Sequence, residues 1–279
     1  MTAVQPVSYQ PQPAGQPLAA PYQPGTVMMA PGQPPQQQWM MKPPPIPGCP
    51  PGLEYLTTLD QVIVKQQKDL LEAFTGWQQA NKYRVLNNQG QQIFFAMEES
   101  EVCMRQCCGA NRGFDLHITD NMQQEVIKVH REFMCCAGCS WCAGADACAF
   151  TVDIQAPVGS QVAYIRQEAS CIAPKYSVRT PEGDIIFRIE GPVCIFPMCG
   201  GQEFVIHNLA TNVTSEANGQ EVGKITKQFA GLVTEMFTNA DTFGVTFPVD
   251  LDVKLKAALI GAVFLIDFMF FEQQQGGGG

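Results

Sequence analysis

Residues 239–252 carry oxygen-bearing side chains at spacings typical of a calcium-binding loop. Numbering from Asn239 puts Asp241 at position 3 and Asp250 at position 12, where an EF-hand loop has ligands. Gly244 falls at position 6, the place of the turn glycine. Because Asn239 adds no charge, we expect weak Ca²⁺ binding, with a Kd on the order of 10⁻⁴–10⁻³ M. The candidate ligands are Asn239, Asp241, Phe243, Asp250 and Asp252.

The same stretch also has the alternation of a β-strand. Phe243, Val245 and Phe247 alternate with Gly244 and Thr246, so one face of an extended chain would be apolar and could face a core. The two interpretations are compatible, because acids at the ends of a core strand could share a cation. Spacing alone leaves both calcium binding and a purely structural strand open.

Five cysteines lie close together in the middle of the chain: Cys135, Cys136, Cys139, Cys142 and Cys148. The last four have the spacing C-x2-C-x2-C-x5-C, which could hold zinc or an iron–sulfur cluster. They could also be buried, inert thiols. We favour S-palmitoylation, because Phe133 and Trp141 place this segment near an apolar interface and acyl chains would hold an acidic protein at a membrane.

An apolar run from Ala257 to Phe271 is interrupted only by Asp267. At about 1.5 Å per residue a helix here is roughly 22 Å long, short of the roughly 30 Å hydrocarbon core of a bilayer. On length we favour a helix that fills a protein core over one that spans a membrane. In either place Asp267 needs a partner or a proton. The predicted helix covers 255–271 and carries Ala257, Ile260, Phe264, Asp267 and Phe270.

The N-terminal residues differ in composition from the rest of the chain. Fourteen of the 21 prolines and a single charged residue, Lys42, lie in the first fifty positions. Such a segment cannot bury enough apolar surface to offset its ordering entropy. We therefore expect a disordered Pro/Gln-rich arm over 1–52, a folded domain over 53–272 and a flexible tail over 273–279. PxxP spacings such as Pro31–Pro34 and Pro47–Pro50 could bind SH3-type domains, although we favour a flexible spacer.

The net charge of −9 limits the partners of this chain. An acidic surface is repelled by nucleic acid, and no basic patch with interleaved aromatics occurs, so nucleic-acid binding is not expected. Residues 1–30 lack the charged and apolar regions of a signal peptide, which predicts that the bulk of the chain stays in the cytosol. No GxSxG, P-loop or GxGxxG motif occurs, and we do not expect an enzyme.

An internal repeat predicts a duplicated β-sheet unit. The pattern NKYRV–G–IF of residues 81–94 returns as PKYSV–G–IF at 174–187, an offset of 93 residues, and FDLH at 114–117 returns as FVIH at 204–207. Both units contain Asn-, Gly- or Asp-bearing turns between strand-like segments. Two sheet units and one apolar helix suggest a closed barrel with the helix in its lumen, because closure removes exposed strand edges.

Nearly the whole chain from residue 46 to 272 closely resembles the phospholipid scramblase family. The family's DADxFGxxFPxDLDxxxK loop matches residues 239–256 except at Asn239, where Asp is common in the family. Further motifs that carry the resemblance are Gly76–Lys82, Cys107–Gly109, Asp120–Met122, Gln124–Val126, Gln155–Pro157 and Ile266–Glu272.

The resemblance implies a mostly β protein with the tubby-like fold, a barrel of about twelve strands around a central C-terminal helix. It implies Ca²⁺ as cofactor, S-acylation of the cysteine-rich loop and membrane phospholipids as partners. It also implies a single C-terminal membrane span, which conflicts with the buried helix that length favours. The location implied is the cytoplasmic face of the plasma membrane with a cytosolic N-terminus, and a minor nuclear pool after loss of acylation.

The function implied is calcium-activated, ATP-independent, bidirectional scrambling of phospholipids between leaflets. The alternative is an acylated, calcium-responsive membrane adaptor that transports nothing. One physical point supports the adaptor, because a sealed barrel with a buried helix offers no polar path for headgroups. Scrambling would require homo-oligomerisation or opening of the barrel.

Overall fold

The computed structural model describes residues 38–67, 80–193, 202–209, 219–228 and 241–271. The chain separates into a unit of residues 1–36 and a second unit of residues 37–279. The first unit lies outside the described residues. The fold below is that of the second unit.

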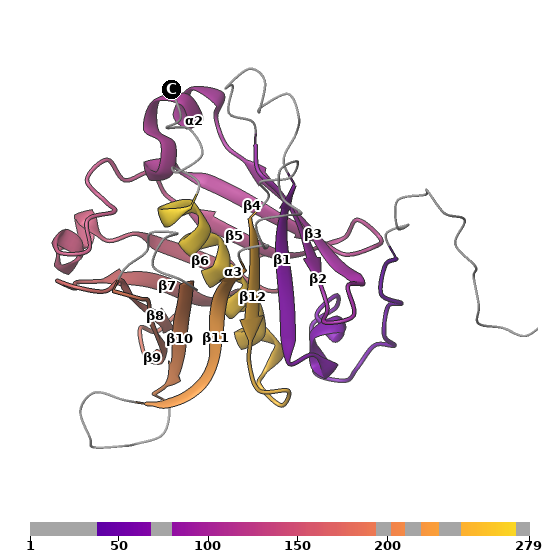
Figure 1. Ribbon diagram of the computed structural model, residues 1–279. Coiled ribbons are helices and arrows are strands. Elements are labelled where there is room, and N and C mark those ends of the chain that lie inside the picture. The colour runs from indigo at the N-terminus through magenta and orange to yellow at the C-terminus, as the bar shows by residue number, and fades with distance from the viewer. Residues whose placement is uncertain (1–37, 68–79, 194–201, 210–218, 229–240, 272–279) are drawn as a thin grey trace, which may run out of the picture. The chain divides into compact units, whose positions relative to one another are not determined.

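The strands of the described residues form one closed antiparallel barrel (Figure 1). Each strand pairs with the next along the chain, and β1 closes the barrel by pairing with β12, with Val62 opposite Val245. This confirms the expected fold class. The strands are β1 Gln61–Gln67, β2 Lys82–Leu86, β3 Gln92–Glu99, β4 Phe114–Thr119, β5 Glu125–Arg131, β6 Thr151–Gln155, β7 Gln161–Glu168, β8 Lys175–Arg179, β9 Ile185–Glu190, β10 Gln202–Asn208, β11 Gln220–Gln228 and β12 Thr242–Thr246.

One short helix precedes the first strand, further short helices lie in the connections between strands, and one long helix follows the last strand. Apolar and polar residues alternate along most strands, so that one face of the sheet packs inward. The helices are η1 Glu54–Thr58, α2 Val102–Cys108, η2 Gly109–Asn111, η3 Cys142–Gly144, η4 Asp146–Cys148 and α3 Val253–Phe270.

The predicted internal repeat is visible in two equivalent hairpins. The β2–β3 hairpin shifts register after Val85, and the β8–β9 hairpin shifts register after Val178, at the matching position of the repeat. Both turns use a glycine with positive φ, 77° at Gly90 and 105° at Gly183, a conformation that favours glycine. The two copies thus build their hairpins with the same turn and the same irregularity.

Helix α3 occupies the lumen of the barrel (Figure 1). Every residue from Lys256 to Met269 is buried, so the helix has no solvent-facing side over that length. The ring of Phe264 lies 5.0 Å from Tyr83 of β2, and the ring of Phe268 lies 4.2 Å from Phe114 of β4. The helix begins two residues before the predicted start, because the Asp252 side chain accepts a hydrogen bond from the Lys254 backbone N–H at 2.8 Å.

The barrel is supplemented by residues that the sequence assigns to the disordered arm. The Met40 N–H donates to the Gln92 carbonyl at 2.8 Å, and the Gln92 N–H donates to the Gln38 carbonyl at 2.9 Å. Lys42 forms an ion pair with Asp120 at 2.8 Å. Residues 38–52 therefore lie on the barrel, because backbone pairing and an ion pair offset the ordering cost that composition alone predicts.

The two PxxP segments differ in what the structure says of them. Pro31–Pro34 lies outside the described residues. In Pro47–Pro50 the Cys49 N–H donates to the Ile46 carbonyl at 3.0 Å, and Gly48 has a φ of 82°. This segment is a turn rather than the extended polyproline II helix that SH3-type grooves bind.

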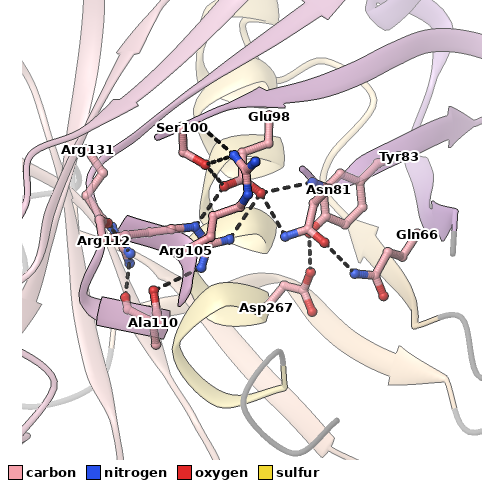
Figure 2. A network of polar contacts seen from close by, with 11 residues as sticks. Gln66, Asn81, Tyr83, Glu98, Ser100, Arg105, Ala110, Arg112, Arg131 and Asp267 are labelled. Atoms are coloured by element: carbon pink, nitrogen blue, oxygen red, sulfur yellow. Dashed lines mark hydrogen bonds and ion pairs between the residues drawn. The ribbon is translucent and has the colours of Figure 1, made fainter. Parts of the chain in front are cut away.

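A buried polar network lies beside the C-terminal half of α3 (Figure 2). Glu98 accepts hydrogen bonds from the Arg112 guanidinium at 2.7 and 3.0 Å and from the Asn81 side chain at 2.9 Å. Burial alone would raise the pKa of Glu98, and the Arg112 contacts bring it below its ordinary value. The Arg112 guanidinium also stacks over the Phe268 ring at 4.7 Å, which connects the network to the helix.

Candidate functional site

Asp241, the central acid of the predicted calcium loop, lies immediately before β12 and is engaged in an ion pair. Its carboxylate contacts the Lys227 ammonium of β11 at 2.8 Å, and both side chains are largely buried. Its backbone carbonyl accepts a hydrogen bond from the Gln66 N–H at 2.8 Å. A cation bound by this carboxylate would therefore have to compete with Lys227.

The remaining described candidates lie along β12 and beyond its far end. Phe243 is buried and is paired on both sides, with Val64 of β1 and Lys227 of β11, so its backbone belongs to the sheet. Asp250 and Asp252 are exposed and follow the strand. The Asp252 carboxylate caps the N-terminus of α3, as described above.

The structure does not bring these candidates around one point. Asp241 precedes β12 and Asp250 follows it. The five residues of this strand span roughly 17 Å at about 3.4 Å per residue, which separates the two carboxylates. Calcium ligands lie within about 2.6 Å of the ion, so one ion cannot bind both carboxylates. Asn239 lies outside the described residues. Within the part of the chain that the structure describes, no group of three or more His, Cys, Asp or Glu could hold a metal ion.

The strand interpretation of this stretch is confirmed. Phe243, Val245 and Phe247 are all buried, as the alternation predicts. The sequence spacing of an EF-hand loop places ligands together only when the chain curls around the ion. Here pairing with β1 and β11 keeps the backbone extended.

The cysteine-rich segment forms the connection between β5 and β6. Cys135, Cys136, Cys139 and Cys142 are exposed, and Cys148 is half-buried. The connection is held by Asn111, whose carbonyl accepts from the Met134 N–H at 3.3 Å, and by Arg166, whose guanidinium contacts Asp146 at 2.8 Å. Four of the five thiols are thus open to modification, in contrast to the interpretation as buried, inert groups.

Hydrogen bonds make one of these thiols more acidic than its neighbours. The backbone N–H and the thiol of Cys142, together with the Trp141 N–H, lower the pKa of Cys139. A bond to the neighbouring Cys135 raises the pKa of Cys136, and the bond to Cys139 raises the pKa of Cys142. Because the thiolate is the nucleophile, the lowered pKa favours the reactive form of Cys139.

A second connection, which the sequence does not reveal, lies against the cysteine-rich segment. Residues 169–174 join β7 to β8, and the Ser170 N–H donates to the Ser140 carbonyl at 2.9 Å. Cys171 and Ile172 of this connection are exposed. The connection reads Ala-Ser-Cys-Ile-Ala-Pro, and a single large apolar residue beside a cysteine is too short a signal to define a pattern.

The predicted helix residues lie inside the barrel. Ala257, Ile260, Phe264 and Asp267 are fully buried, and Phe270 is half-buried. The predicted partner for the helix acid is present, because the Tyr83 hydroxyl donates to Asp267 Oδ2 at 2.7 Å (Figure 2). Among the helices of the described ranges, none combines the length and the apolar character needed to cross a bilayer.

Comparison with known proteins identifies the class to which this barrel belongs. The sequence model of the Scramblase family matches residues 40–273, which shows that the chain belongs to the scramblase family. The match covers the barrel, the cysteine-rich connection and the central helix.

Individual relatives agree with this assignment. The chain is 42% identical to phospholipid scramblase 2 of Bos taurus, over 93% of this chain and 85% of the relative. It is 44% identical to phospholipid scramblase 1 of Homo sapiens, over 84% and 70% of the two chains. A solved Arabidopsis thaliana protein aligns with a TM-score of 0.40 and 8% identity, over 77% of this chain and 97% of that chain.

Proposed function

We propose that this protein scrambles phospholipids in both directions between membrane leaflets, in response to Ca²⁺ and without ATP. The observation that carries the proposal is family membership over residues 40–273, with relatives named phospholipid scramblases at 42–44% identity. The lack of a P-loop motif in the sequence is in keeping with a process that does not use ATP.

We place the membrane attachment at the cysteine-rich connection. S-acylation of Cys135, Cys136, Cys139, Cys142 and Cys148 would anchor the protein, and the first four thiols are exposed. One acyl chain binds a membrane only marginally, whereas two or more hold a protein stably. We propose that these chains hold the protein at the cytoplasmic face of the plasma membrane, and that their removal would release a minor pool that could reach the nucleus.

For the calcium response we favour the turn that carries Asp250 and Asp252 over the Asp241 end of β12. Both carboxylates are exposed, whereas Asp241 is already neutralised by Lys227. The exposed Lys254 and the buried Lys256 lie next to this turn in sequence, which weakens its attraction for a cation. We therefore keep the expected Kd on the order of 10⁻⁴–10⁻³ M.

The filled lumen bears on the route that lipids take. Because α3 is buried along its length, we place the lipid path on the outer surface of the barrel or between two copies of the chain. The competing function is an acylated, calcium-responsive adaptor that moves no lipid, and the same burial of α3 favours it.

Reconstitution of the purified protein into vesicles with a fluorescent lipid reporter tests the proposal. Membrane-impermeant quencher is added with and without Ca²⁺. We expect calcium-dependent loss of signal beyond the outer-leaflet fraction. The double variant Asp250→Asn/Asp252→Asn should lose the calcium response while keeping its fold, because Asn also caps helices.

The Asp241→Asn variant serves as the matched comparison and should keep the response. If Asp241→Asn loses the calcium response and the double variant keeps it, the calcium site would instead be assigned to the end of β12 near Lys227. No loss of signal with well-incorporated wild-type protein would overturn scrambling and leave the adaptor function.

A further inference from the structure

Two connections form one continuous surface at the ends of β6, β7 and β8. The Ser170 N–H donates to the Ser140 carbonyl at 2.9 Å. Gly144 and Ala169 are also close, because a methyl group added to Gly144 would lie 3.6 Å from the Ala169 methyl, an ordinary contact distance. The β7–β8 connection is thus held against the cysteine-rich segment. Any membrane that the acylated cysteines approach also faces this connection.

Large apolar side chains stand out from both connections. Trp141 is 73% exposed and Ile172 is 74% exposed, and Cys171 beside Ile172 is exposed as well. Aromatic residues such as Trp favour the boundary between headgroups and acyl chains. These side chains would enter that boundary when the surface meets a bilayer.

A pocket of about 220 Å³ opens beside Ala169 at the base of the β7–β8 connection. Strands β7, β8 and β9, which line it, lie side by side in the barrel (Figure 1). Half of its lining residues are charged: Glu168, Lys175, Arg188 and Glu190. A pocket of this kind next to exposed apolar side chains is positioned where lipid headgroups would lie.

The charged side chains around the pocket differ in whether they form ion pairs. Lys175 is paired with Glu190 at 2.8 Å, and Glu168 is paired with Arg179 at 2.8 Å. Arg166 contacts Asp146 at 2.8 Å. These pairs leave Arg188, which is exposed and forms no ion pair with any described residue. The four charged side chains of the lining sum to zero, but Arg179 from outside the lining pairs with Glu168, so the positive charge of Arg188 is the one that no acid in the lining pairs.

We propose that this pocket binds the phosphate group of a membrane phospholipid, with the Arg188 guanidinium as the main ligand. The forked geometry of guanidinium matches a phosphate with two parallel hydrogen bonds. Trp141 and Ile172 insert beside it, so apolar and phosphate contacts occur together. The inference rests on the membrane association in the proposed function and adds the lipid group that is recognised.

The test uses the full-length protein after treatment with hydroxylamine at neutral pH, which cleaves thioesters and removes acyl chains. Binding to vesicles of phosphatidylserine and phosphatidylcholine is measured by co-sedimentation at fixed salt. Arg188→Gln should lower the affinity by roughly tenfold, the effect of losing one charged hydrogen-bonded contact. Ile172→Ser should also lower it.

Lys65→Gln is the matched control, because it removes one positive charge from an exposed position on β1, which lies on the other side of the closed barrel from β7. We expect less than a twofold change for this variant. Equal losses of vesicle affinity in Arg188→Gln and Lys65→Gln would show that general charge attraction explains the binding. That result would overturn the proposal that the pocket is a phosphate-binding site. Undetectable binding of the wild-type protein would overturn it as well.

Two further arms separate this inference from its alternatives. Inorganic phosphate at millimolar concentration should compete only weakly with the vesicles for the protein. Full displacement of the protein from the vesicles would show that the pocket binds free phosphate and would overturn the proposal that it binds a lipid headgroup. Scrambling is measured in parallel in the reconstituted vesicles. Pocket-dependent binding without scrambling would overturn the proposed function alone, and scrambling with no loss of binding in Arg188→Gln would overturn the pocket alone.

Discussion

Among single residues, Lys256 shows how the barrel accommodates a charge in its interior. Its ammonium is fully buried at the start of α3 and donates to the carbonyls of Leu56, Leu59 and Val249 at 2.8, 2.8 and 2.7 Å. It also lies 5.2 Å from the Phe247 ring. In a helix that spans a membrane, a lysine near the helix end can extend its ammonium to solvent. Here the Lys256 hydrogen bonds connect α3 to η1 and its C-terminal flank and to the turn after β12.

Replacing Lys256 by Met should strongly destabilise the protein. The change keeps the apolar stem and removes the donors to three backbone carbonyls, two of them in a buried setting. Leaving buried acceptors unsatisfied costs about 1–3 kcal/mol each, so we expect a loss of about 3–5 kcal/mol in the free energy of unfolding. Urea denaturation measures it. Lys254→Met, at an exposed position, should change stability by about 0.5 kcal/mol or less, and equal effects of the two substitutions would contradict the role of Lys256.

At the scale of elements, the junction of β11 and β12 depends on a glycine. A methyl group added to Gly223 would lie 1.9 Å from the Thr246 carbonyl oxygen, which is backbone and cannot turn away. The Thr246 hydroxyl accepts from the Lys224 N–H at 3.0 Å and fixes the same contact. Glycine at this position therefore allows the last strand to approach β11 and close the barrel.

Gly223→Ala should lower the midpoint of thermal unfolding. The added methyl group forces β12 away from β11, and such overpacking typically costs about 1–3 kcal/mol. Gly144→Ala is the control, because the nearest atom to its new methyl group is the Ala169 Cβ at an ordinary 3.6 Å. Calorimetry on both variants is the measurement, and an unchanged Gly223→Ala midpoint would mean that the strands can separate at no cost.

Elements with a local signal could be predicted from the sequence, and contacts between distant residues could not. Alternation along 243–247 and the repeated turn glycines define strands and hairpins, and the length of the apolar run favours a buried helix. The partner of Asp267 is Tyr83, 184 residues away, and no local pattern identifies it. The spacing of the calcium loop predicts a site only for a curled backbone, and sheet pairing prevents that.

Across the whole described region, two similar halves share one central helix. Aromatic side chains from the first half contact α3 through Tyr83 and Phe114, and the Tyr176 hydroxyl of the second half lies 3.4 Å from the Met269 sulfur. Among the described elements this central helix occurs once, after the last strand, so neither copy of the sheet unit can bury its inner face without it. The closing pair β1–β12 likewise joins the two ends of the barrel sequence. Both features favour cooperative folding of the barrel as one unit.

Two histidines on the outer surface connect this cooperative unit to pH. His117 contacts Glu125 at 2.7 Å and Glu99 at 3.0 Å, and His130 contacts Asp115 at 2.7 Å. Burial alone would lower the pKa of both imidazoles, and the carboxylates raise it above the ordinary value. The charged form of each histidine therefore stabilises the folded state.

The sign of the pH dependence follows from these raised pKa values. The stabilisation is complete below the unfolded-state pKa of about 6.5 and is lost as pH rises through the higher folded-state pKa. The thermal midpoint should therefore fall between slightly acidic and slightly alkaline pH at constant ionic strength. In His117→Asn/His130→Asn this slope should flatten. A wild-type slope in the double variant would show that other groups set the pH dependence of the barrel.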